Sequence, residues 1–234
     1  MMRRVVERRL LGRPSFAMNS RLLSSSEEKP SVNMSASLFK NPIVHQLWTT
    51  RQEAKRNLKK GDEFGVCAIT KTPADSRVQI AYPFTSDALL WEAYRNPWGQ
   101  MRLGRLLEDL DALAGNIAFF HVHTENQSED RYPTIVTASV DRIRLHQRPA
   151  EGSDQLLSGQ VTWTGTSSME IRMQCAEAEA APGKEWLEAY VTFVTLDPET
   201  NKPMRIPKIA PVSEQEAAYF AAGAGRAAAK KKRR

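Results

Sequence analysis

The residues best suited to chemistry are three carboxylates in one predicted helix, Glu108, Asp109 and Asp111. Helical periodicity predicts that Glu108 and Asp109 point away from the apolar stripe and form a solvated face. Asp111 instead shares a face with the small residues Ala114 and Ala118, beside which another backbone can approach closely. A carboxylate at such a position suits a general base that activates water, or a nucleophile that attacks directly. The alternative is a hydrogen-bonded structural aspartate.

Three residues with small or amide side chains, Asn96, Gly99 and Gly104, flank the predicted start of this helix. The first turn of a helix offers unpaired backbone N–H groups at the positive end of the helix dipole. Such donors can hold a carbonyl oxygen while it becomes an oxyanion, and glycine lets a substrate come close. The other interpretation is that the glycines only make a tight turn.

Other kinds of site are not supported by the sequence. His121 and His123 lie at a predicted helix end, where their side chains do not align, and the other two histidines are remote, so we predict no metal site. The chain has no GxSxG elbow, Walker loop or GxGxxG motif, and we expect no cofactor. Cys67 and Cys175 lie outside any CxxC spacing and are predicted to be reduced thiols.

The helix that carries the carboxylates is predicted from Leu103 to Phe120, because its leucines recur every three and four residues. Before it, spacing and turn residues predict four elements. They are an amphipathic helix over Pro42–Lys59, a turn over Lys71–Asp75, a strand over Ser76–Phe84 and a short helix over Ser86–Tyr94.

Beyond the long helix the pattern changes to strands separated by turns. A polar loop is predicted over Glu125–Asp130, and strands over Thr134–Leu145, Leu156–Ala178 (broken near Gly165) and Glu185–Leu196. One strand, one long helix and then four strands lack α/β alternation. The sequence therefore predicts an α+β fold, in which a curved antiparallel sheet of five strands packs on a single helix.

The net charge of +6 is concentrated at the two ends of the chain. Residues 1–26 carry six arginines and one glutamate, and residues 226–234 carry six basic residues, so the middle has a net charge of −5. An acidic middle argues against a nucleic-acid-binding surface there. No stretch approaches the roughly 18 consecutive apolar residues of a spanning helix. We expect neither a nucleic-acid partner nor a membrane span.

The N-terminal segment has the composition of a mitochondrial or plastid transit peptide. Its arginines are spread among short apolar residues, serines cluster at Ser24–Ser26 and acids are scarce. We predict a transit peptide over residues 1–30, with a disordered basic arm as the alternative. A helical extension over 31–70, the main domain over 71–200 and a Pro/Ala-rich tail over 201–234 complete the expected organisation.

The tail contains a predicted helix over Ser213–Ala229, and then the sequence KKKRR. A block of basic residues at a chain end is most simply solvated, with a nuclear signal or an RNA contact as alternatives.

Three segments, RLGRLLEDLDALAGNIA, TIVTASVDRI and SGQVTWTGTSSMEIRM, occur in this order and spacing. Together they resemble the acyl-CoA thioesterases with a hot-dog fold, above all the mitochondrial branch, whose members usually carry two tandem hot-dog domains. The likeness runs from about Ser76 to Phe220. It implies a hot-dog domain in the mitochondrial matrix that hydrolyses fatty acyl-CoA to a free fatty acid and CoA.

The resemblance also assigns roles to residues. The family's helix aspartate falls on Asp111, as base or nucleophile, and the asparagine of its Asn-x-x-Gly motif falls on Asn96, which would orient water or the carbonyl. Many relatives have a glycine pair before the helix, of which this chain keeps only Gly104, after Arg102 and Leu103. The family's substrate contacts fall on Ala138, Ser139, Val140, Ser167, Ser168 and Met169. A structural interpretation of these six residues is that they alternate in a sheet or form a turn.

The hot-dog family places its active sites between two domains, so a single domain needs a second copy. A homodimer would supply Asn96 from one subunit and Asp111 from the other. A non-catalytic hot-dog subunit that binds CoA or a protein partner is the alternative, favoured by the departure at Arg102 and Leu103. A dehydratase acting on hydroxyacyl or enoyl thioesters is a third hypothesis, but such sites typically need an Asp/His pair, and no histidine lies near Asp111 in the pattern.

Overall fold

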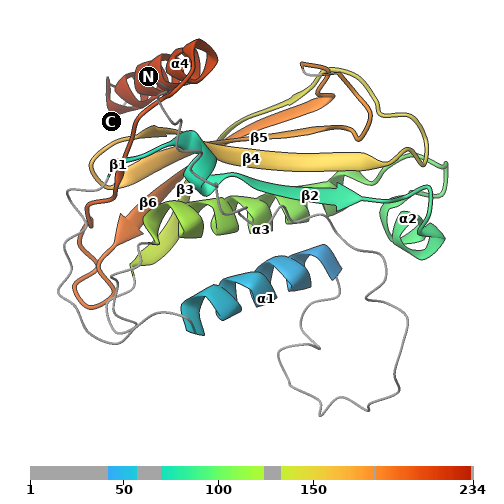
Figure 1. Cartoon of the computed structure of the whole chain (residues 1–234), viewed down its shortest axis with the longest axis horizontal. Helices are drawn as coiled ribbons and strands as arrows, with labels where there is room; N and C mark the ends of the chain where they lie inside the picture. The colour runs from blue at the N-terminus through green and yellow to red at the C-terminus, as the bar shows by residue number, and fades with distance from the viewer. Residues whose placement is uncertain (1–41, 57–69, 124–132, 182, 233–234) are drawn as a thin grey trace, which may run out of the picture.

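The computed structural model describes residues 42–56, 70–123, 133–181 and 183–232 of the 234-residue chain. Its helices and its main sheet are stacked in layers (Figure 1). Helix α1 (Pro42–Arg56) lies against helix α3 (Leu103–Val122), α3 lies against the sheet, and helix α4 (Glu214–Lys232) lies on the far side of the sheet. The predicted transit peptide, the predicted loop over 125–130 and Cys67 fall outside the described residues.

The main sheet has five strands in the order β2-β4-β5-β6-β3, and every neighbouring pair is antiparallel. This confirms the predicted α+β fold. The strands are β2 (Val78–Tyr82), β3 (Thr134–Leu145), β4 (Gln155–Thr164), β5 (Ser168–Glu177) and β6 (Leu187–Leu196). The three central strands follow one another as hairpins, whereas β3 precedes them in the chain and forms the edge beside β6.

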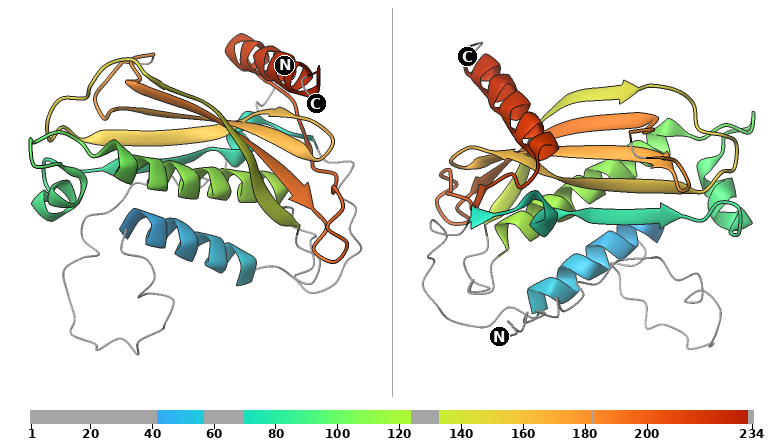
Figure 2. Two further views of the ribbon diagram at one scale, coloured as in Figure 1. Left: turned by 180° about the vertical axis from the view of Figure 1, so that it is seen from behind. Right: turned by 45° about the horizontal axis from the view of Figure 1, so that its top comes forward.

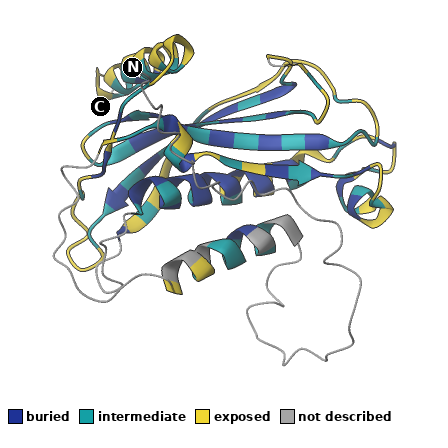
Figure 3. Cartoon of the chain, in the orientation of Figure 1, coloured by how far each residue is buried: buried dark blue, intermediate teal, exposed yellow. Residues whose placement is uncertain are grey.

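Helix α3 fills the curve of the sheet (Figure 2). The predicted leucine stripe forms this contact, because Leu106, Leu113 and Ile117 are at most 1% exposed and pack in the core with residues of β4 and β5. Each such side chain contributes about 1.5–3 kcal/mol by leaving water. Helix α1 covers the helix from the other side, where Asn116 Nδ2 donates to the Leu47 carbonyl at 2.9 Å. Figure 3 shows that buried residues concentrate in α3 and the sheet.

Several short elements lie where the sequence carried little periodic signal. A parallel pair of two-residue strands, β1 (Thr70–Lys71) and β7 (Lys208–Ile209), was not predicted. The predicted turn is a 3₁₀ helix, η3 (Pro73–Ser76), so β2 begins two residues later than expected. Helix α2 (Ala88–Tyr94) begins after Asp87, whose side chain accepts a hydrogen bond from Leu90 N at 2.9 Å.

Helix α4 packs on the outer face of the sheet, opposite α3 (Figure 2). Arg226 donates to both carboxylate oxygens of Glu170 at 2.7 Å, and Lys230 pairs with Asp141 on β3. The expectation of a solvated basic end was therefore wrong at Lys230, because acidic residues on the outer face of the sheet bind its ammonium group. None of the helices within the described ranges is long and apolar enough to cross a membrane.

Candidate active site

Asn96 lies in the loop between α2 and α3 and holds this loop closed. Its backbone N donates to Gln100 O at 2.7 Å, and its Oδ1 accepts from the backbone N of Trp98 at 3.0 Å and of Gln100 at 2.9 Å. Gly99 has φ +79°, a conformation that favours glycine, and the Glu151 carboxylate occupies the place of a side chain at this position. The loop thus uses the amide oxygen of Asn96, and Nδ2 is the donor that Asn96 can offer to a ligand.

Tyr94 and Arg102 form the base of the loop. Arg102 N donates to Tyr94 O at 2.6 Å, and the Arg102 guanidinium donates to the Ala93 carbonyl near the end of α2. This contact gives Arg102 a structural role at the base of the loop. Arg102 is also the N-cap residue of α3, but its side chain makes no capping hydrogen bond to that helix.

The first turn of α3 is open, as the sequence predicted. Gly104 is exposed, and a Cβ atom built on it would have no neighbour within 4 Å. Because the side chain of the N-cap residue Arg102 makes no hydrogen bond to the helix, the N–H groups at the start of the helix can meet an acceptor from outside the chain. This arrangement suits the binding of a carbonyl oxygen that gains negative charge.

Asp111 is exposed, although Ala114 and Ala118, with which it was expected to share a face, are fully buried. It continues a line along α3 with Leu103 and Leu107, which are 38% and 40% exposed. Residues four apart lie on one helix face, so the carboxylate stands at the end of an exposed apolar strip. Such a strip suits either an acyl chain or a second protein surface.

The position of Asp109 differs from the one predicted from the sequence. It was expected on the solvated face, but it is fully buried, and its Oδ2 accepts hydrogen bonds from Tyr82 Oη at 2.8 Å and Tyr94 Oη at 2.5 Å. Burial, with the nearby Asp109 charge, raises the pKa of Tyr82 well above its usual value. The spacing already held the signal, because Asp109 lies three residues after Leu106 and four before Leu113 in the buried stripe. The expectation held for Glu108, which is exposed and pairs with Arg105 at 3.1 Å.

Gly104 and Asp111 are separated along the helix. Seven residues at a helical rise correspond to about 10 Å. A reacting carbonyl lies about 3 Å from its hydrogen-bond donors and from the attacking oxygen, so a carbonyl held at Gly104 lies well away from the backbone position of Asp111 in the same chain.

The three predicted substrate contacts on β3 lie at an irregular edge. Extra residues interrupt the pairing of β3 with β6 between Thr137 and Ser139 and again between Val140 and Arg142, which identifies two β-bulges. Ala138 and Val140 are exposed, whereas the Ser139 hydroxyl donates to Asp141 Oδ1 at 2.7 Å. The edge exposes several large apolar side chains: Val136, Val140, Ile143 and Leu145.

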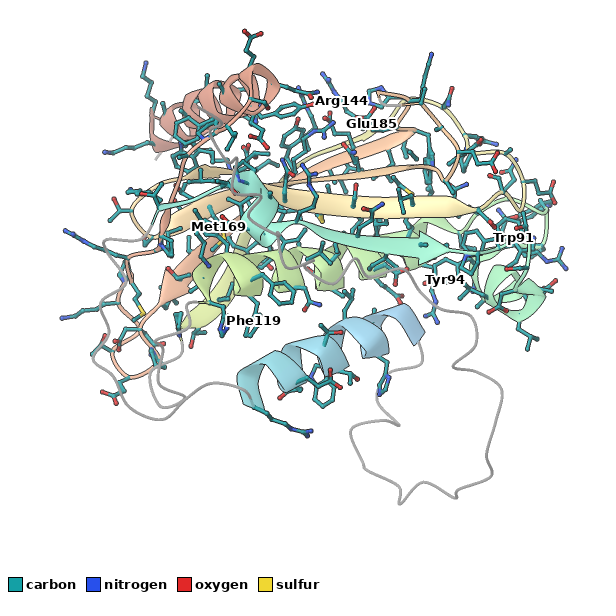
Figure 4. The ribbon with its side chains drawn as sticks, viewed as in Figure 1. Trp91, Tyr94, Phe119, Arg144, Met169 and Glu185 are labelled. Atoms are coloured by element: carbon teal, nitrogen blue, oxygen red, sulfur yellow. The ribbon has the colours of Figure 1, made fainter. Side chains whose placement is uncertain are left out.

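The other predicted contacts belong to the hairpin between β4 and β5. Ser167 and Ser168 are half-buried, while Met169 is fully buried in the core and offers no surface to a ligand in this form of the protein. Figure 4 shows Met169 at the opposite end of the sheet from Tyr94 and Trp91. One chain therefore does not bring this hairpin together with the Asn96 loop.

No group of three or more His, Cys, Asp or Glu side chains in the described part of the chain could hold a metal ion. His121 is buried in the last turn of α3 with Nε2 3.0 Å from the Pro207 carbonyl. Cys175 is a free, buried thiol whose pKa is raised by burial.

Comparison with curated proteins gives related thioesterases, although no protein-family model matches the chain. The chain is 35% identical over 218 residues to acyl-coenzyme A thioesterase 2, chloroplastic, of Humulus lupulus, covering 90% of this chain and 49% of the relative. It is 39% identical over 203 residues to acyl-coenzyme A thioesterase 4, mitochondrial, of the same plant, covering 82% and 37%. With human acyl-coenzyme A thioesterase 9, mitochondrial, the identity is 32% over 152 residues, covering 64% and 34%. The chain thus spans about half the length, or less, of these relatives.

Solved structures share the fold. An acyl-CoA hydrolase from Staphylococcus aureus in complex with butyryl coenzyme A, coenzyme A and coenzyme A disulfide superposes with a TM-score of 0.58 at 24% identity, covering 70% of this chain and 90% of that chain. A hexameric acyl-CoA thioesterase gives a TM-score of 0.55 at 25% identity, covering 70% and 97%. The chain is therefore a homologue of the acyl-CoA thioesterases and has the hot-dog fold.

Proposed function

We propose that this protein is an acyl-CoA thioesterase, which hydrolyses fatty acyl-CoA to a free fatty acid and CoA at a site shared by two copies of the chain. The observation that carries the proposal is the exposed Asp111 carboxylate, at the end of the apolar strip of Leu103 and Leu107 on α3. The uncapped first turn of the same helix and the Asn96 loop beside it supply hydrogen-bond donors.

The proposed reaction uses these groups in a single attack. The thioester carbonyl accepts hydrogen bonds from Gly104 N–H and Asn96 Nδ2 of one copy. Asp111 of the other copy takes a proton from water as the water oxygen attacks the carbonyl carbon. The tetrahedral intermediate then collapses, the C–S bond breaks, and the leaving CoA thiolate takes the proton back from Asp111, which regenerates the carboxylate.

The edge strand β3 supports a paired arrangement. Its backbone edge and the exposed Val136, Val140 and Ile143 favour addition of another strand. A two-fold axis at this edge would set the two β3 strands antiparallel. The β4–β5 hairpin of one copy, with Ser167 and Ser168, would then approach the partner's end that carries Asn96. Pairing would thus bring together the β4–β5 hairpin and the Asn96 loop, which lie far apart within one chain.

The direct test is CoA release from a series of acyl-CoAs, followed with a thiol reagent. Replacing Asp111 by Asn should lower kcat by about 100-fold or more, since a general base contributes about 10²–10⁴-fold. Glu108→Gln is the matched control, because Glu108 is an exposed carboxylate of the same helix, and it should stay within about twofold of wild type. Undiminished turnover in Asp111→Asn would exclude the role of Asp111. CoA binding without hydrolysis of any acyl-CoA would favour the non-catalytic subunit.

Residues 1–30 are proposed to direct the protein to the mitochondrial matrix. Support comes from their spread arginines and scarce acids, and from relatives named as mitochondrial and chloroplastic proteins. A fluorescent protein fused after residue 30 should enter the matrix, and replacing Arg3, Arg4, Arg8 and Arg9 by Gln should abolish import. Import into plastids alone would contradict this location.

A further inference from the structure

We propose that Asp109 is a positioning residue, which acts through Tyr94 to hold the Asn96 loop in register with α3. The inference rests on the proposed function for its kinetic readout. Asp109 does not touch the substrate in this scheme. It sets the geometry of the groups that do.

The hydrogen bond between Tyr94 and Asp109 links the two segments that carry the candidate catalytic residues. Tyr94 precedes Asn96 by two residues, and Asp109 precedes Asp111 by two. The Tyr94 Oη to Asp109 Oδ2 distance is 2.5 Å, and both residues are 0% exposed. Burial strengthens a charge-assisted hydrogen bond and makes the loss of one partner costly.

Tyr94 is held by more than one contact, directly beside the loop. Its carbonyl accepts from Arg102 N at 2.6 Å at the base of the loop. Its ring packs at 5.5 Å from the Tyr82 ring and 5.4 Å from the Phe84 ring, measured between centroids. Removing the hydroxyl would leave the ring and the contact with Arg102 in place but would remove the hydrogen bond to Asp109 in the second turn of α3.

Tyr82 provides an internal control for this inference. Its hydroxyl donates to the same Asp109 oxygen at 2.8 Å, and it is equally buried. It lies on β2, however, which carries none of the proposed site residues. Tyr82→Phe and Tyr94→Phe therefore remove the same chemical group from the same carboxylate, and only the second loosens the loop.

The kinetic test compares these two variants by acyl-CoA hydrolysis. Tyr94→Phe should lower kcat about tenfold with KM changed less than about twofold, since small misplacement of reacting groups costs rate. Tyr82→Phe should keep kcat within about threefold. In an Asn96→Ala background, Tyr94→Phe should lower kcat less than about twofold further, because the two changes act through one group. Equal losses in the two phenylalanine variants, or an undiminished effect in the Asn96→Ala background, would overturn the inference.

Backbone hydrogen exchange gives a readout that does not depend on activity. The amides of Asn96, Gly99 and Gln100, which donate within the loop, should exchange about tenfold faster in Tyr94→Phe and less than about twofold faster in Tyr82→Phe. Equal exchange in the two variants would overturn the inference even if the enzyme is active. If the wild type hydrolyses no acyl-CoA, the proposed function fails. Faster exchange of the loop amides in Tyr94→Phe, but not in Tyr82→Phe, would still support the positioning role of the Tyr94–Asp109 hydrogen bond.

Should Tyr94→Phe not fold, Asp109→Asn replaces it, because the amide keeps the shape and an acceptor oxygen. Faster exchange in the loop than in β2 supports the inference, and equal change in both contradicts it.

Discussion

Lys230, in the last turn of α4, lies with its Nζ 2.5 Å from Oδ2 of Asp141 on the edge strand β3. The same Nζ lies 2.7 Å from Thr192 Oγ1 and 3.2 Å from Ser139 Oγ. Burial alone would raise the pKa of Asp141, but the hydrogen bonds from Lys230, Thr192 and Ser139 outweigh it and hold this pKa below its ordinary value. The C-terminal helix is thus joined to the strand that carries predicted substrate contacts.

Replacing Lys230 by Met should lower the free energy of unfolding by about 1–2 kcal/mol near pH 7, because the Asp141 side chain, 7% exposed, loses its cation. Since the folded pKa of Asp141 is depressed, this stabilisation is present above its unfolded pKa of about 3.9 and is lost as pH falls through the folded value. Urea unfolding at several pH values measures both effects. Lys231→Met, at an exposed neighbour, should change neither, and an equal loss in both variants would contradict the prediction.

Gly223 allows α4 to lie close to the sheet. A Cβ atom there would lie 2.6 Å from Trp163 Cβ and 2.9 Å from Glu170 Oε1. Gly223→Ala should therefore destabilise the protein by about 1–2 kcal/mol, because overpacking outweighs the gain in helix propensity of about 1 kcal/mol.

The matched control is Gly225→Ala in the same helix, where a Cβ atom meets nothing within 4 Å. This change should stabilise by about 0.5–1 kcal/mol. Denaturant midpoints of the two variants should shift in opposite directions. Stabilisation by both substitutions would show that α4 does not pack as closely as the structure describes, and destabilisation by both would contradict the open surroundings of Gly225.

The order of elements was predictable because it depends on periodicity. The leucine stripe of α3 and the succession of strands and turns after it are local signals, and the structure has both. The packing of α4 was not predictable, since Arg226 and Lys230 meet Glu170 and Asp141 from distant parts of the sequence. An Ala-rich segment with a basic end has the same composition whether it is docked or free.

In the candidate site, too, local spacing was predictable from the sequence and contacts between distant residues were not. The spacing marked one helix with three carboxylates, but the interpretation placed Asp109 on the solvated face, whereas it is buried. The position of Asp109 within the leucine stripe was a local signal of burial, but its partners Tyr82 and Tyr94 lie in other elements, and no local pattern identifies them. Asp111 is exposed because the apolar strip of Leu103 and Leu107 also stays exposed in one chain. The apolar character of a helix face does not reveal whether the protein's own core or another surface covers it.

His121 predicts a distinct pH dependence of stability. Burial lowers its pKa to about 4; the Pro207 carbonyl partly opposes this shift, and the nearby Lys71 charge reinforces it. Between that value and about 6.5 the unfolded chain binds a proton that the folded chain does not. Stability should therefore fall with decreasing pH in this window, by up to about 3 kcal/mol in total.

The variant His121→Gln keeps an N–H donor for the Pro207 carbonyl and does not titrate. The slope of unfolding free energy against pH between 4.5 and 6.5 should be shallower in this variant than in wild type, by about one proton at its steepest. Identical slopes would mean that His121 binds its proton equally in the folded and unfolded states.

A shared site makes a specific prediction for mixtures of inactive variants. Asn96→Ala and Asp111→Asn should each be nearly inactive alone. When they are unfolded and refolded together at equal amounts, about half of the dimers are mixed, and each mixed dimer regains one of its two sites. Activity should return to about a quarter of the wild-type value.

The recovery follows from the composition of the mixed dimer. One site pairs the intact Asn96 of the Asp111→Asn chain with the intact Asp111 of the Asn96→Ala chain, while the other site has lost both residues. Mixing Asp111→Asn with Asp111→Ala is the control, and it should recover nothing because no intact Asp111 is present. Absence of recovery in the first mixture, with dimers demonstrated by sedimentation, would mean that Asn96 and Asp111 act within one chain. That result would contradict the proposed site shared by two copies of the chain.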